Sequence, residues 1–172
     1  MSSTLAPNPT LIELGPGAQI AMHGFRASAF GQTKCGCLQK FFNHTFGSQQ
    51  GVATLRLMME LARCLGYKGQ RKLKIASPSC VRFTQDEASL LSALSAAQDD
   101  DPDQARAHLT WLFVRPPREY EETLVFDLVE YFSIQGLEIN TPENGAQLST
   151  TSAGTSIDKV TAFPAPTQVG HA

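Results

Sequence analysis

The sequence predicts a mainly α-helical protein, a compact bundle of about five helices with a minor β component. Three observations favour this class. Apolar residues recur at helical spacing in several segments, capping residues open two of these segments, and Gly or Pro separates them. Apolar residues make up 42% of the 172 residues, enough to fill one hydrophobic core. We therefore expect one helical domain over residues 10–139, between a flexible N-terminus (1–9) and a disordered tail (140–172).

The first part of the domain predicts a hairpin and then a short helix. Two apolar stretches within residues 10–30 flank the turn sequence GPG at positions 15–17, which is typical of a β-hairpin. Residues 37–46 are expected to be helical and to end at Gly47. Their apolar side recurs at i, i+3, i+4 and i+7, on Leu38, Phe41, Phe42 and Thr45.

Residues 49–65 predict a central helix. Its only strongly polar stripe is Arg56, Glu60 and Arg63, and the other side chains along its middle are mostly apolar. Such a helix buries more than half of its circumference. Residues 72–76 then alternate charged and apolar side chains, which predicts a short strand with one wet face.

Three further helices follow, each with a start signal or a breaker beside it. Thr84 and Glu87 match a capping box that opens a helix to about residue 98. Asp101 is expected to cap a helix over residues 102–113, and the last helix covers 118–135. Residues 137–139 suggest a closing strand. The expected core residues are Leu55, Met58, Met59, Ala62, Leu91, Leu94, Leu112, Leu128 and Phe132.

Composition and charge narrow the class of protein. The net charge is −2, so no global basic excess favours nucleic acid or an anionic membrane. We find no secretory pattern at the N-terminus and no apolar run near the roughly 18 residues that span a bilayer. These features predict a cytosolic protein without membrane contact, in which the four cysteines are reduced thiols.

Cys35 and Cys37 are the candidate metal ligands, because they are separated by a single residue. Two thiolates leave a tetrahedral zinc site half empty, and a helical His44 would lie on the order of 10 Å from Cys37 along the axis. Ordinary thiols, and hence no cofactor, are therefore the favoured interpretation. A zinc or iron site and a redox-sensing pair both stay open as alternatives.

A basic segment is the candidate anion-binding surface. Six basic residues and one acidic residue lie between positions 56 and 74, and the four expected to reach an anion are Lys68, Arg71, Lys72 and Lys74. A DNA-binding regulator is one alternative, although solvated faces explain such a segment better and a nucleic-acid partner is not favoured.

Phe126 is the candidate partner contact. It falls on the polar stripe of the last predicted helix, where Glu122 and Glu130 flank it. Either the helix is buried on two sides, or Phe126 is an exposed anchor for a partner with a basic rim. No catalytic motif is present. The leading hypothesis is a non-enzymatic interaction or regulatory protein, whose partner is another protein or a second copy of this chain.

Overall fold

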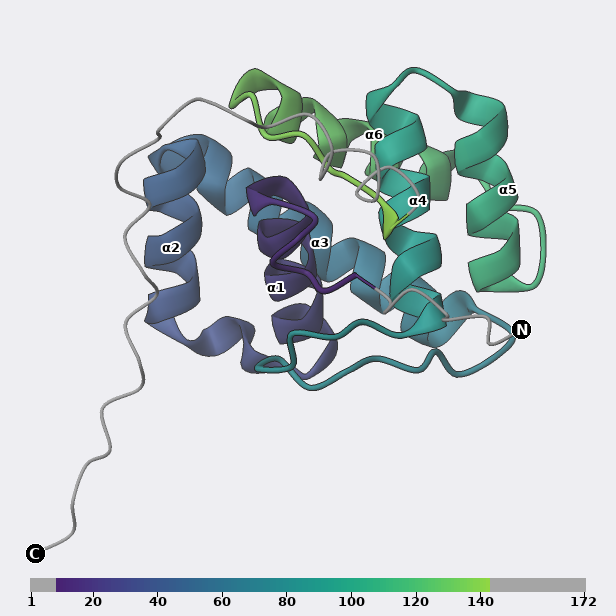
Figure 1. Ribbon diagram of the computed structural model, residues 1–172, viewed down its shortest axis with the longest axis horizontal. Coiled ribbons are helices and arrows are strands. Elements are labelled where there is room, and N and C mark those ends of the chain that lie inside the picture. The colour runs from purple at the N-terminus through teal and green to yellow at the C-terminus, as the bar shows by residue number, and fades with distance from the viewer. Residues whose placement is uncertain (1–8, 143–172) are drawn as a thin grey trace, which may run out of the picture.

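The computed structural model describes residues 9–142, and these form six α-helices and one short 3₁₀ helix (Figure 1). The predicted helical class is confirmed. The predictions made for residues 1–8 and 143–172 lie outside the described residues. The elements are α1 (Pro16–Ala29), η1 (Gln32–Lys34), α2 (Gly36–Phe46), α3 (Ser48–Lys68), α4 (Gln85–Gln98), α5 (Pro102–Phe113) and α6 (Glu119–Ile134).

Helix α3 lies at the centre of the bundle, as predicted. It contacts α1, α2, α5 and α6, while α4 packs mainly against α5 and α6 (Figure 1). The buried apolar side chains form one continuous cluster across all six helices. Most of the predicted core belongs to this cluster, namely Leu55, Met58, Leu91, Leu94, Leu112, Leu128 and Phe132.

The predicted N-terminal hairpin is wrong, because residues 16–29 form helix α1. Gly15 adopts a φ of 86° immediately before the helix, and Pro16 occupies its first turn, where the missing N–H has no cost. The first turn of the helix lies close to the chain that follows α6. A Cβ built on Gly17 would lie 2.1 Å from the carbonyl oxygen of Glu138. The GPG sequence therefore starts a helix that packs against residues 138 and 139.

The two predicted short strands are also wrong, since the described residues contain no β-strand. In the first segment, the Lys74 N–H donates to Asp86 Oδ2 at 2.7 Å and the Ala76 N–H donates to Glu87 Oε1 at 3.2 Å. In the second, the Ile139 N–H donates to Gln98 Oε1 at 2.8 Å. Side chains at the two ends of α4 thus satisfy backbone groups that a neighbouring strand would otherwise pair.

Two helix starts agree with the prediction made from their capping residues, whereas the end of the central helix does not. In the capping box, the Glu87 N–H donates to Thr84 Oγ1 at 3.2 Å, and the Thr84 N–H donates to Glu87 Oε2 at 2.8 Å. Asp101 Oδ1 accepts from the Gln104 N–H at 3.0 Å at the start of α5. Helix α3, however, continues past Gly66 as far as Lys68. This extra turn carries the C-terminal end of α3 beyond the core.

A buried ion pair fixes the irregular segment between α3 and α4 onto α1. The Arg26 and Glu87 side chains are each 1% exposed, and Arg26 Nε donates to Glu87 Oε1 at 2.7 Å. The same guanidinium donates to the carbonyl oxygens of Cys80 at 2.5 Å and Arg82 at 2.8 Å. One side chain on α1 therefore positions residues 77–82 and the start of α4.

The described chain continues beyond the expected domain boundary at residue 139. The Asn140 side chain donates from Nδ2 to the carbonyl oxygen of Leu14 at 3.0 Å, and Thr141 is buried. These contacts tie the end of the described chain to the segment that precedes α1.

Candidate functional site

An apolar groove lies where three parts of the fold meet: the C-terminal end of α1, the C-terminal half of α3 and residues 72–75. Its volume is about 590 Å³, and it is open to solvent on one side. The apolar side chains that line it are Phe25, Ala29, Met59, Ala62, Leu65, Leu73 and Ile75. A space of this size accommodates about two or three apolar side chains of a ligand.

Two residues predicted to be in the core line this groove instead. Met59 is 44% exposed and Ala62 is half-buried. Neighbouring Tyr67, also in the groove, is 87% exposed. The prediction failed because no helix of the described chain covers this face of α3. An apolar stripe indicates that a surface avoids water, but it does not distinguish a core from a groove.

Two basic side chains, Arg63 and Lys72, stand at the edge of the groove. Arg63 donates from Nη2 to Glu60 Oε1 at 2.7 Å, and this hydrogen bond raises the pKa of the guanidinium and lowers that of the Glu60 carboxyl. The exposed Lys72 forms no ion pair with any residue between 9 and 142. It is therefore the cation most available to a ligand in the groove.

The structure separates the four predicted anion contacts. Arg71 pairs with Asp86 through bonds of 2.6 and 3.0 Å and also lies over the Trp111 ring, so its charge is already satisfied. Hydrogen bonding from Arg71 lowers the pKa of the Asp86 carboxyl. Lys68 Nζ lies 5.4 Å from the centre of the Tyr120 ring. Lys74 is exposed away from the groove, which leaves Lys72 alone of the four on its edge.

The predicted contact surface on α6 is less open than an exposed anchor would need. Phe126 is half-buried and packs against the core. Glu122 accepts two hydrogen bonds from the Arg106 guanidinium, at 2.7 and 3.0 Å, and only Glu130 is fully at the surface. These positions favour the interpretation that α6 is covered on two sides. A contact through Phe126 stays a prediction.

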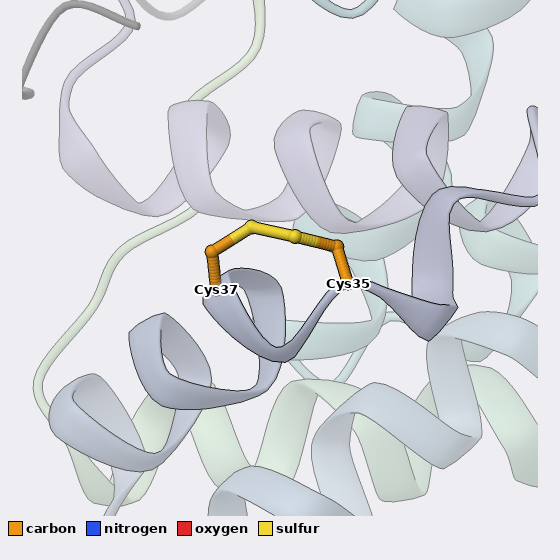
Figure 2. Close-up of a disulfide and its surroundings, with 2 residues drawn as sticks. All are labelled: Cys35 and Cys37. Carbon is orange, nitrogen blue, oxygen red and sulfur yellow. A yellow bond between two sulfur atoms is a disulfide. The ribbon is translucent and has the colours of Figure 1, made fainter. Parts of the chain in front are cut away.

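Cys35 and Cys37 are joined by a disulfide, with their Cα atoms 5.3 Å apart (Figure 2). The expectation of four reduced thiols is therefore wrong for this pair, whereas Cys64 and Cys80 are free. Disulfides are rare in reducing compartments when they brace a fold, but that rule does not exclude a bond between near neighbours. Cys35 is the residue before α2 and Cys37 is in its first turn, and both are exposed.

Cys64 is a buried residue of α3, as expected for a small apolar side chain. Burial raises the pKa of its thiol, which therefore stays protonated. Within residues 9–142 we find no group of three or more His, Cys, Asp or Glu side chains that could hold a metal ion. Metal binding by Cys35 and Cys37 stays a prediction, and in the disulfide form the two sulfurs are bonded to each other.

No helix of the described part of the chain is long and apolar enough to cross a membrane. Comparison with models of known families, with curated proteins and with solved structures gives no significant match.

Proposed function

We propose that the protein is a non-enzymatic cytosolic interaction protein, and that its groove binds an acidic, amphipathic segment of another protein. One observation carries the proposal: an open apolar groove at whose edge Lys72 forms no ion pair with any residue that the structure describes. The cytosolic location rests on composition alone.

The apolar part of the proposed ligand follows from the lining. Exposed Met59 offers a flexible, polarisable surface, which suits recognition of side chains that vary in shape. Tyr67 beside it supplies a rigid ring of the kind enriched at binding surfaces. A helical or extended segment with two or three apolar side chains would cover both residues.

The acidic part follows from the charges at the edge. Lys72 and Arg63 favour carboxylates near the groove and disfavour basic ligands. A nucleic acid is a weaker candidate, because the two arginines of this segment near the groove are paired with carboxylates, Arg71 with Asp86 and Arg63 with Glu60. A second copy of the chain is a weaker candidate too, because its acidic helix α6 holds Phe126 against its own core.

A selection experiment tests this function without knowledge of the natural partner. The full chain would be used to select binders from a displayed library of random 15-residue peptides. We expect enrichment of sequences that combine Asp or Glu with two or three apolar residues. Selection of basic peptides, or none above background, would contradict the proposal, as would dimerisation that blocks the groove.

Matched variants locate the binding. Met59→Glu puts a carboxylate in the groove and should weaken a selected peptide by about tenfold or more, because it repels the ligand's acidic residues. Val52→Glu is the control, since Val52 is a 39% exposed residue of the same helix outside the groove. Equal effects of the two variants would place the binding elsewhere.

A further inference from the structure

The disulfide between Cys35 and Cys37 closes a very short loop, with a sequence separation of 2. A cross-link stabilises a fold mainly by restricting the unfolded chain, and this effect grows with the length of the closed loop. So short a loop restricts the unfolded chain little. Its two cysteines are also exposed rather than packed in the core. The bond therefore has little value as a structural brace.

The position of the pair favours reactivity instead. Cys35 is the N-cap residue of α2, and no side chain caps this helix. The free N–H groups and the dipole of a helix N-terminus stabilise a thiolate and lower the pKa of a cysteine placed there. The first turn has no acidic residue, and the exposed Lys34 directly precedes Cys35. The helix N-terminus and the neighbouring lysine thus both favour a thiolate on Cys35.

We propose that Cys35 and Cys37 are a redox-active pair that exchanges with low-molecular-weight thiols such as glutathione. The thiolate of one small thiol attacks Cys37 Sγ, which forms a mixed disulfide and breaks the bond to Cys35. Cys35 leaves as the thiolate that the helix N-terminus stabilises, because the sulfur with the lower pKa leaves faster. A second small thiol then attacks the small-molecule sulfur of the mixed disulfide and releases Cys37.

The reaction balances as a two-electron exchange. Two small thiols lose two protons and two electrons and become one disulfide, while the protein disulfide becomes two thiols. Oxidation of the protein is the same path in reverse. Neither Cys64, which is buried, nor Cys80, which lies in the segment held by Arg26, is needed for any step.

A redox titration of the full chain tests the proposal. The protein would be equilibrated in buffers with a range of ratios of reduced to oxidised glutathione, and free thiols would be trapped with a maleimide and located by mass spectrometry. We expect Cys35 and Cys37 to convert together and reversibly, with a midpoint inside the range. A pair that stays oxidised in excess reduced glutathione, or that never forms the disulfide, would overturn the proposal.

Single-cysteine variants test the assigned roles. Cys35→Ser should trap glutathione on Cys37 as a stable mixed disulfide. In Cys37→Ser, alkylation of Cys35 should have a pH midpoint below that of an ordinary thiol, about 8.5. Lys34→Glu in this background should raise the midpoint. An ordinary midpoint for Cys35, or zinc held stoichiometrically by the two reduced cysteines of the wild type, would contradict the assignment.

Discussion

Among the interactions of single residues, the buried ion pair of Arg26 and Glu87 is the one that most requires both partners. Each side chain is 1% exposed, so neither charge is solvated by water. The guanidinium is instead surrounded by the Glu87 carboxylate and by backbone carbonyls of residues 80 and 82. Removing one partner of such a pair leaves the other charge buried and uncompensated.

Glu87→Gln should therefore lower the free energy of unfolding by about 3 to 5 kcal/mol. Glutamine still suits the capping box, so the loss reports the missing charge rather than the missing cap. Glu122→Gln is the matched control. Its pair with the half-exposed Arg106 should be worth only about 0 to 1 kcal/mol. Denaturant titration measures the unfolding free energy of both variants. Similar small losses in the two would show that the Arg26 pair contributes no more to stability than the exposed pair.

His23 makes stability depend on pH in the mildly acidic range. Burial and the charge of Arg26 both lower its pKa from the usual value of 6.5. The unfolded chain then binds a proton at His23 more readily than the folded chain does. The contribution of His23 to stability is therefore complete above pH 6.5 and is lost as the pH falls through the pKa of the folded state. The carboxyls of Asp86 and Glu121 have lowered pKa values too and add their own loss only at lower pH.

His23→Gln should flatten this dependence. The difference in unfolding free energy between pH 7.5 and a mildly acidic buffer above about pH 5 should be smaller in the variant than in the wild type, because the titrating group is gone. Denaturant titrations at the two pH values measure it. The same slope in both proteins would show that another group is responsible.

At the scale of elements, glycines decide how closely the helices approach one another. A Cβ built on Gly51 of α3 would lie 2.6 Å from both the Asn43 nitrogen and the Phe42 carbonyl oxygen of α2. Backbone atoms cannot move aside as a flexible side chain can. The contact between α2 and α3 therefore requires a residue without a side chain at this position.

Gly51→Ala should destabilise the protein by more than 1 kcal/mol, within the range of about 1 to 3 kcal/mol for overpacking. Gly66→Ala in the same helix is the control, because a Cβ there meets nothing within 4 Å. Alanine favours helix over glycine, so this change should stabilise by about 0.5 to 1 kcal/mol. Thermal melts of the two variants should shift in opposite directions. A shift in the same direction would contradict the packing assigned to Gly51.

The helices that the sequence predicts well are those with a single clear signal. The capping box at Thr84 and the Asp101 cap each indicate only one structure, the start of a helix, and a helix starts at both. The sequence around Gly15 is compatible with two structures, because glycine followed by proline is found in turns as well as at helix starts. The alternation in residues 72–76 was equally ambiguous. It places Leu73 and Ile75 towards the core, but carboxylates of α4 replace the expected strand partner.

In the whole molecule, the candidate groove was not predicted because it is formed by segments that are distant in the sequence. The groove lies between α1, α3 and residues 72–75, and Met59 in its lining is open to solvent. That arrangement depends on contacts between distant parts of the chain, such as Arg26 with Glu87, which are 61 residues apart. Local periodicity carries no information on such pairs. The sequence predicted the four basic residues of the segment as anion contacts alike, because it could not show that Arg71 is neutralised by Asp86.

Two charge reversals test whether an acidic ligand binds in the groove beside Lys72: the affinity of the full chain for one selected acidic peptide is measured in Lys72→Glu and in Lys74→Glu. Lys72 lines the groove, whereas Lys74 is exposed two residues further on and does not. Lys72→Glu should weaken binding by about tenfold, or about 1.4 kcal/mol, and Lys74→Glu by no more than about twofold. Equal losses would show that only the general charge of the segment matters, and no loss in Lys72→Glu would show that the groove is not the binding site.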